Sequence, residues 1–283
     1  MRAVLLATLA AASLAAAACG GGSTVSPESV AQAATKTAKL KSYRVATTTK
    51  LKLAKRNLTF TGSGAFDPKG RRGRLSLDMS QLNQISGASG SPYNLGYAQF
   101  ILAGTAMYLR IPLLKQLNPS LKPWVKIDQR QAGQTQGLDF GAFLQFGQGG
   151  DPSHALDYLR ATGKLKKEGS EKVRGVETTH YTGTVDLKKV PAAAPARVRA
   201  EVRKNVDRLI TLTGQQTIPV EVWVDGNGYI RRETYTNKLP IQNQKADVKS
   251  TLELFDFGTP VVAPVPPAED VTDLSGGPKG ATS

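Results

Sequence analysis

The stretch that decides the fold runs from residue 43 to residue 53 and reads YRVATTTKLKL. Apolar side chains at Tyr43, Val45 and Leu53 share one parity along it. Positively charged side chains at Arg44 and Lys52 have the other parity. A period of two places successive side chains on opposite faces of a β-strand. The stretch therefore predicts a strand with one face toward a core and the other toward solvent.

The same alternation recurs on both sides of a turn signal that follows this strand. Residues 58–66 and 75–79 alternate in the same way, and the DPKG sequence at 67–70 between them favours a turn. A second turn signal, DGNG at 225–228, joins 218–224 to 229–238 as a hairpin. Further strands are predicted at 97–102, 105–111, 124–128, 165–168, 171–174, 177–187 and 246–257.

Three helices accompany these strands in the sequence. The first begins at Ser26, Pro27 and Glu28, which provide a cap, a first-turn proline and a first-turn acid. The second is predicted over 151–160, where an Asp-Pro pair begins it. The third follows the PAAAP sequence at 191–195 and places valines on one face.

Many antiparallel strands with few helices indicate an α+β domain, in which one large sheet is covered by a few helices. Three helices do not fill such a sheet if it is strongly curved, so we expect an apolar cavity beneath them. Strand parity selects the residues that would line this cavity: Leu58, Phe60, Leu75, Leu77, Met79, Val220 and Val222. We expect this domain to span 26–260 and a Pro- and Gly-rich tail, 261–283, to fray.

The N-terminus has the features of an export signal. A single Arg2 precedes a short alanine-rich apolar run, and small residues at Ala16–Ala18 stand directly before Cys19. This arrangement resembles the lipobox of bacterial lipoproteins, although Ala16 stands where a leucine is usual. The resemblance implies removal of residues 1–18, lipidation of Cys19, a flexible tether over 19–25, and a position on the outer face of the cell membrane.

Composition limits the partners of the chain. There are 37 Lys and Arg residues against 22 Asp and Glu residues, which gives a net charge of +15. Such an excess favours anionic partners such as phospholipid headgroups or phosphorylated glycolipids, or else serves solubility alone. Export makes nucleic acid an improbable partner, so we expect none. Cys19 is the single cysteine, and a disulfide within the chain is excluded.

Signals of catalysis and metal binding are weak. The two histidines, His154 and His180, have no partner at the spacing of metal ligands. The sequence contains no Gly-x-Ser-x-Gly motif and no phosphate-binding loop. A carboxylate pair can still form in space, which leaves an envelope hydrolase as a distant alternative. We therefore predict no catalytic residues, no metal site and no cofactor.

The basic third helix admits three interpretations. It covers the sheet as a surface helix, or it gates the cavity and presents Arg199 and Arg203 to a lipid headgroup, or it lies on a membrane with its valines in lipid. The segment 130–150 is rich in Gln and Gly with interspersed Leu and Phe, and we interpret it as a flap over the cavity. Whether this flap controls entry is left open by the sequence.

Several longer segments carry a resemblance to a known family. They are, in order, the lipobox start, 42–53, 64–80, 108–109, 122–127, 151–159, 169–187 and 218–232. Together they resemble the actinobacterial lipoproteins of the LppX and LprG type, within the LolA- and LolB-like superfamily. The resemblance extends over residues 40–260 and contains no catalytic motif.

This resemblance implies a large curved antiparallel sheet, a half-open β-barrel, with about three helices over its concave face and an apolar cavity for acyl chains. It also implies a monomeric lipid carrier that moves or presents lipids and acylated glycolipids across the envelope, with a membrane transporter as a possible partner. A second hypothesis keeps the fold but makes the protein a sensor or interaction module that signals to a membrane protein. No ligand-contact residue can be transferred from the family.

Overall fold

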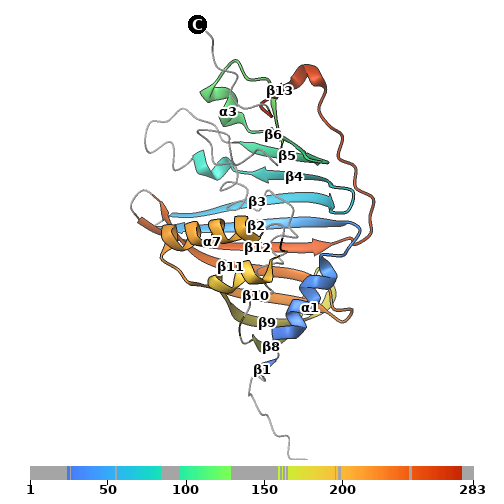
Figure 1. The fold of residues 1–283 in the computed structure, drawn as a ribbon, viewed down its shortest axis with the longest axis vertical. Coiled ribbons are helices and arrows are strands. Elements are labelled where there is room, and N and C mark those ends of the chain that lie inside the picture. Colours follow the sequence, from blue (N-terminus) through green and yellow to red (C-terminus); the bar gives the residue numbers. More distant parts are fainter. Residues whose placement is uncertain are drawn as a thin grey trace, which may run out of the picture.

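A computed structural model describes residues 24–25, 27–54, 56–83, 96–128, 159, 161, 163, 165–194, 196, 199–241 and 244–275. Most of these residues belong to one open 13-stranded sheet (Figure 1). Its strands are β1 (Thr24–Val25), β2 (Tyr43–Leu53), β3 (Arg56–Asp67), β4 (Arg72–Asp78), β5 (Tyr97–Ala103), β6 (Ala106–Arg110), β7 (Trp124–Asp128), β8 (Leu165–Val173), β9 (Val176–Asp186), β10 (Thr217–Asp225), β11 (Ile230–Ile241), β12 (Gln244–Phe255) and β13 (Val271–Asp273).

The sheet consists of two antiparallel meanders joined side by side. Strands β2 to β7 follow one another in space as in sequence, and so do β8 to β12. The meanders meet where β12 pairs with β2 in antiparallel register, for example Ser250 opposite Thr49. Strands β1 and β13 occupy the two outer edges, and the edges do not meet. The predicted α+β fold with a large, open and curved sheet is therefore confirmed.

Helices and 3-10 turns pack on one face of this sheet or lie at its ends (Figure 1). The helices of the described residues are α1 (Pro27–Thr37), α3 (Pro112–Leu117), α6 (Val190–Ala193) and α7 (Arg199–Thr213), and the 3-10 turns are η1 (Ser80–Leu82), η4 (Leu187–Lys189) and η6 (Ala268–Asp270). Helix α1 packs against β10 and β11, and α7 packs against β11. Of the helix predicted over 151–160, only Leu159 is described, and the segment 130–150 lies outside the described residues.

Side-chain hydrogen bonds fix the two predicted turns. Asp67 Oδ1 accepts a hydrogen bond from Gly70 N at 2.7 Å, which closes the turn between β3 and β4. Asp225 Oδ1 likewise accepts from the backbone N–H of Asn227 and of Tyr229, each at 2.9 Å. Short carboxylates of this kind satisfy turn backbones in place of water. Both turn predictions are confirmed.

Two glycines in β3 explain how closely the strands of the first meander pack. A Cβ atom on Gly62 would collide with the Leu77 side chain, and one on Gly64 would collide with the backbone carbonyl of Arg74. Larger residues at either position would push β4 away from β3. The glycines thus let Leu75 and Leu77 lie across the surface of β3.

Two segments predicted to lie outside the domain contribute strands to it. Thr24 and Val25, at the end of the predicted tether, pair antiparallel with Lys166 and Leu165 of β8. At the other edge, β13 pairs in parallel with β7. The sheet is therefore mixed, and its boundary lies at residue 273 instead of 260.

Polar contacts hold the C-terminal segment in place. Lys126 Nζ donates to Asp273 Oδ2 at 2.7 Å, and Lys122 N donates to Thr272 Oγ1 at 2.9 Å. Leu274 N donates to the backbone carbonyl of Lys126 at 2.9 Å. Composition alone predicts fraying here, because it contains no information about the edge of β7 with which this segment pairs.

The strand predicted at 165–168 and the one predicted at 171–174 form the single strand β8. Its pairing with β9 shifts register between Lys167 and Gly169, and Gly169 has a φ of 152°. A glycine in a strand marks such a bulge as readily as it marks a turn, which explains the predicted break.

Candidate functional site

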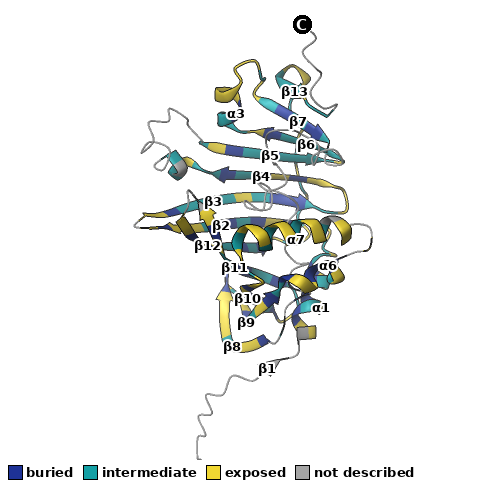
Figure 2. Cartoon of the chain, turned by 60° about the vertical axis from the view of Figure 1, so that its left-hand side comes forward, coloured by how far each residue is buried: buried dark blue, intermediate teal, exposed yellow. Residues whose placement is uncertain are grey.

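Strand register divides the side chains of the sheet between two faces, which we call the inner face and the outer face. The inner face is the one on which α1 and α7 pack. One row of cross-strand neighbours on it consists of Leu254, Val45, Gly64, Leu75, Phe100, Leu109 and Val125. Figure 2 shows buried residues recurring along these strands. This row of the inner face is therefore apolar from β12 to β7.

All the residues predicted to line the cavity lie on strand positions that face inward or pack against inner-face residues. Leu75, Leu77, Val220 and Val222 are buried in the main apolar cluster, and Met79 packs against it. The predicted parity is thus reproduced on β4 and β10. The cavity itself, and contact of these residues with a ligand, stay predictions.

A second, smaller apolar cluster lies on the same face near the ends of the β2–β3 and β11–β12 hairpins. It contains Leu51, Leu53, Leu58, Leu239, Ala246 and Val248, and Phe60 packs against it. Leu58 and Phe60 therefore belong to a different cluster from the other predicted lining residues. Sequence parity gives the face of a residue but not its position along the strand, so this separation is not visible in the sequence.

Polar residues interrupt the apolar side chains of the inner face, and we call them the polar band: Thr47, Thr49, Glu233, Tyr235 and Ser250. The Tyr235 side chain is itself part of the main apolar cluster. Thr49 Oγ1 and Ser250 Oγ, on paired strands, are 3.4 Å apart. Glu233 is fully buried, with no exposed surface. Within the strand predicted over 229–238, this glutamate has no feature in the sequence that marks it as buried. Glu233 faces inward because it pairs with Val222 across β10 and β11. The sequence alone does not give this pairing.

The carboxyl group of Glu233 has an unusual environment. Tyr235 Oη donates a hydrogen bond to Glu233 Oε2 at 3.2 Å, and Oε1 has no hydrogen-bond partner among the described residues. Its cross-strand neighbours are Leu252 on β12 and Val222 on β10. Burial raises the pKa of this carboxyl group to about 8, against a smaller opposing effect of the hydrogen bond from Tyr235. Glu233 is therefore protonated and neutral at pH 7.

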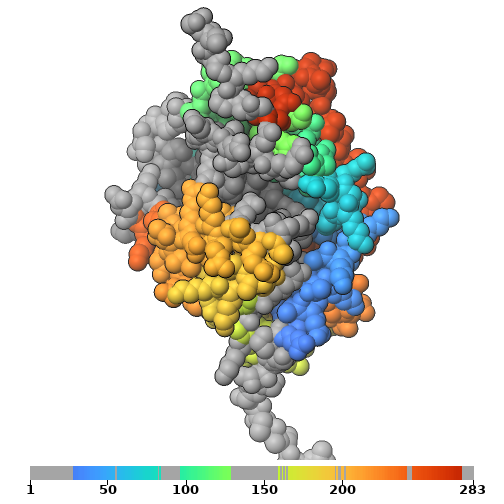
Figure 3. Space-filling view, viewed as in Figure 1, coloured from blue at the N-terminus to red at the C-terminus, as the bar shows by residue number. Residues whose placement is uncertain are grey.

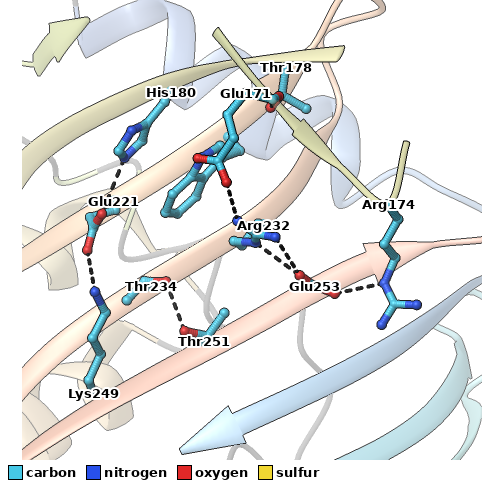
Figure 4. Close-up of polar contacts among 11 residues, drawn as sticks. Glu171, Arg174, Thr178, His180, Glu221, Arg232, Thr234, Lys249, Thr251 and Glu253 are labelled. Atoms are coloured by element: carbon cyan, nitrogen blue, oxygen red, sulfur yellow. Dashed lines mark hydrogen bonds and ion pairs between the residues drawn. The ribbon is translucent and has the colours of Figure 1, made fainter. Parts of the chain in front are cut away.

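The outer face of β8–β12 carries a network of paired charges, shown in Figure 4. Arg232 Nη1 is 3.0 Å from Glu171 Oε1, and Arg232 Nη2 is 2.9 Å from Glu253 Oε1. Arg174 Nε donates to Glu253 Oε2 at 2.7 Å, and Trp223 Nε1 donates to Glu171 Oε2 at 2.8 Å. The hydrogen bond from Trp223, followed by that from Arg232, holds the pKa of Glu171 below its ordinary value.

His180 belongs to this outer-face network. Its ring stacks on that of Trp223, with centroids 4.2 Å apart and planes inclined by 3°. Its Nε2 atom lies 3.3 Å from Glu221 Oε2, and Lys249 Nζ donates to Glu221 Oε1 at 2.8 Å. Within the described part of the chain, no three His, Cys, Asp or Glu side chains gather as metal ligands would. His154 lies outside the described residues.

Helix α7 lies against the sheet through its apolar stripe. Val206 is buried in the main cluster, and Val202, Leu209 and Ile210 pack against it. This arrangement agrees with a helix that covers the sheet and argues against valines immersed in lipid. Arg199 and Arg203 are exposed on the same helix. Their contact with a headgroup stays a prediction, and Cys19 lies outside the described residues.

In a space-filling view, α7 and α1 form two ridges on the inner side of the molecule (Figure 3). The ridges cover β10 and β11, which are the strands they pack against. No helix among the described residues has the length and apolar character needed to cross a membrane.

Comparison with known proteins gives distant likenesses. No protein-family model matches the chain. It is 30% identical over 172 residues to an uncharacterized 31.2 kDa protein of Streptomyces griseus, encoded in the rplA–rplJ intergenic region. The match covers 59% of this chain and 55% of that protein, so the chain spans about half the length of the curated relative it matches.

Solved structures with a similar course of the chain come from other bacteria. LprF from Mycobacterium bovis is 15% identical with a TM-score of 0.47, over 86% of this chain and 99% of that chain. The lipoprotein LppX of Mycobacterium tuberculosis is 15% identical with a TM-score of 0.45, over 84% and 96%. A putative outer membrane lipoprotein-sorting protein domain from Vibrio parahaemolyticus is 11% identical with a TM-score of 0.29, over 84% and 95%.

Proposed function

We propose that this protein is an exported lipoprotein, anchored through Cys19, that binds acyl chains of lipids or glycolipids against its inner face. It would carry or present them across the cell envelope and would catalyse no reaction. The observation that supports the proposal most strongly is the apolar inner face itself. It extends across both meanders, and its buried residues include Leu75, Leu77 and Val222.

Energetics support binding through hydrocarbon alone. Each methylene group removed from water contributes roughly 0.8 kcal/mol, so a long acyl chain needs few polar contacts to bind. Apolar ligand sites generally contain only a few polar groups that fix orientation. On the inner face these groups are those of the polar band, while the charges of the outer-face network are already paired with one another.

The test is native mass spectrometry of the soluble chain that begins at Gly20. This chain lacks Cys19 and retains every described residue. We expect the protein purified from its host to carry co-purified lipid, and the delipidated protein to bind added phospholipid. Lipid-free protein that also ignores added phospholipid and acylated glycolipid would contradict the proposal. Capture of a stoichiometric membrane protein without lipid would instead support the sensor hypothesis.

A matched pair of variants on β4 distinguishes the two faces. Leu77→Gln places an amide on the inner face, and Ser76→Gln places the same side chain on the outer face next to it. We expect Leu77→Gln to lower lipid occupancy and Ser76→Gln to leave it unchanged, with folding of both verified by circular dichroism. Equal occupancy in the two variants would show that lipid does not bind at the inner face of β4.

The anchor and the headgroup contact have separate tests. Radiolabelled palmitate should enter the wild-type protein in its host and not the Cys19→Ser variant. Arg199 and Arg203 are exposed, and replacing both by glutamine removes one long hydrogen bond, from Arg199 Nη2 to the Ala194 carbonyl at 3.4 Å. We expect this double variant to lose preference for anionic over zwitterionic phospholipid while keeping its binding of acyl chains.

A further inference from the structure

Glu233 lies where an apolar side chain would be expected. On the inner face it stands between Val222 and Leu252, both of which are buried in the main cluster. The glutamate itself has no exposed surface. A buried polar group costs free energy unless hydrogen bonds replace those it made with water. A leucine at this position would avoid that cost, so the carboxyl group requires an explanation.

The cations nearest to Glu233 in the sequence are engaged elsewhere. Arg232 points to the outer face, where it binds Glu171 and Glu253. Arg231 Nε binds Asp225 Oδ2 at 2.6 Å, and its guanidinium group lies 4.0 Å from the centre of the Phe257 ring. Neither arginine neutralises Glu233. The carboxyl group avoids a buried charge by keeping its proton.

The hydrogen bond from Tyr235 determines where that proton is. Tyr235 Oη donates to Glu233 Oε2, so Oε2 acts as the carbonyl-type acceptor of the neutral acid. The proton then lies on Oε1, which has no hydrogen-bond partner among the described residues. Glu233 therefore offers a hydrogen-bond donor on the inner face that lacks an acceptor.

We propose that Glu233, oriented by Tyr235, is a hydrogen-bonding site for the ester carbonyl oxygen of an acyl lipid on the inner face. The inference rests on the proposed function. An ester carbonyl is a neutral acceptor and matches the missing partner of Oε1. It is also the group directly attached to an acyl chain, so its binding at Glu233 leaves the hydrocarbon against the main apolar cluster that surrounds this residue.

The site also accounts for selectivity that an apolar surface alone does not provide. Hydrocarbon burial discriminates poorly between ligands of similar length, because each methylene contributes about the same free energy. A buried donor left without its acceptor disfavours ligands that lack the acceptor. Glu233 would thus select ester-linked chains over ether-linked chains and would fix how far a chain enters.

The test compares two probes that differ only in this acceptor. Phosphatidylglycerol with two palmitoyl esters and its di-O-hexadecyl ether analogue have the same headgroup and chain length. Both are titrated at pH 6.5 against the delipidated soluble chain that begins at Gly20. Dissociation constants are measured by competition with a fluorescent fatty-acyl probe. We expect the wild-type protein to prefer the ester lipid by about tenfold, as one hydrogen bond of ordinary strength implies.

Three variants identify the origin of the preference. Glu233→Leu removes the donor and should bind both lipids with equal affinity. Glu233→Gln keeps a neutral donor in a side chain of the same size and should retain part of the preference. Glu253→Gln changes a glutamate on the outer face and should behave as the wild type.

The outcomes separate this inference from the proposed function. Equal binding of both lipids by the wild-type protein would overturn the role of Glu233 and leave acyl-chain binding intact. A preference that persists in Glu233→Leu would also overturn it, because the selectivity would then arise elsewhere. Failure of the wild-type protein to bind either lipid would contradict the proposed function and this site together.

Discussion

Two neighbouring residues of β11 show how differently the two faces of one strand treat charge. Arg232 on the outer face lies between Glu171 and Glu253 and joins strands β8, β11 and β12 through ion pairs. Glu233 on the inner face is buried among aliphatic side chains, and no cation pairs with it among the described residues. The outer face thus stabilises ionised carboxylates, whereas the inner face keeps its carboxyl group neutral. Ion pairs thus connect neighbouring strands on the outer face, and the buried carboxyl group of Glu233 on the inner face carries no charge.

The largest effect that tests this contrast comes from placing a cation on each face of β11. Glu233→Lys puts an ammonium group among apolar neighbours, and we expect a loss of about 3–5 kcal/mol in the free energy of unfolding. Thr236→Lys puts the same group on the outer face, where we expect a change below about 1 kcal/mol. Urea denaturation monitored by circular dichroism gives both values. Similar losses for the two variants would contradict the assigned faces.

A smaller effect should follow from breaking the outer-face network at its centre. Arg232→Met leaves Glu171 and Glu253 without their shared cation, and we expect a loss of about 2 kcal/mol at pH 7. This figure is kept low because Glu171 is about half exposed, with 48% of its side-chain surface in contact with solvent.

The control for this change is the exposed pair Lys166–Glu168, whose charged atoms are 2.9 Å apart. Lys166→Met should cost clearly less than Arg232→Met, since exposed ion pairs contribute little. Denaturation at pH 7 measures both variants. If Lys166→Met lowered the free energy of unfolding as much as Arg232→Met, the outer-face network would not stabilise the protein more than an exposed ion pair does.

The pH dependence of stability should distinguish the faces by the sign of its slope. The pKa of Glu233 rises from 4.5 in the unfolded chain to about 8 in the folded protein. The contribution of Glu233 to the free energy of unfolding is fully present below its unfolded pKa. This contribution is lost as pH rises through the folded pKa, by up to about 1.4 kcal/mol per pH unit. The pKa of Glu171 is lowered, so its contribution is present above its unfolded value and is lost on acidification.

Chemical denaturation from pH 5 to pH 8 measures the slope that belongs to Glu233. The Glu233→Gln variant should show a flatter profile and should exceed the wild-type stability toward pH 8, because the amide does not ionise. Parallel profiles for the two proteins would mean that Glu233 is ionised in the folded state. Below pH 4 both proteins should lose stability together as outer-face carboxylates gain protons.

The smallest predicted effect concerns the edge of the sheet. Lys126, followed by hydrogen bonds from Ser275, lowers the pKa of Asp273 to about 2. The pair is largely exposed, and we expect Asp273→Asn to cost about 0.5 kcal/mol at pH 7 and nothing below pH 2. Hydrogen exchange of the β13 amides provides a local measure, and faster exchange confined to β13 is the expected result. Unchanged exchange would show that the ion pair does not hold this edge.

Much of the fold could be predicted because period-two patterning is strong in most strands. The bounds predicted for the strand at 43–53 and for the one at 124–128 are those of β2 and β7. Short elements were missed where no such period exists. Helix α3 contains Pro112 at its start and few residues beyond one turn, and β13 is defined by its partner β7 instead of by its own sequence.

The candidate site was only half predictable, for a physical reason. Parity identifies the apolar residues of a strand face, and it did so for Leu75 and Val220. Glu233 has the opposite polarity to its surroundings, so hydrophobic patterning works against finding it. Glu233 lies between Val222 and Leu252 because of the register in which β10, β11 and β12 pair. The sequence of a single strand does not determine that register.

The short pairing of β1 with β8 has a mechanical consequence if Cys19 carries the proposed lipid anchor. With Thr24 and Val25 paired to the sheet, the five chain steps from Cys19 to Thr24 reach at most about 17 Å. If a pull on the lipid detached this two-residue strand, the eight chain steps from Cys19 to Pro27 would reach at most about 28 Å. Because β1 is an edge strand, its release breaks no pairing elsewhere in the sheet. The molecule would then have two working distances from the bilayer, one for a docked strand and a longer one for a released strand.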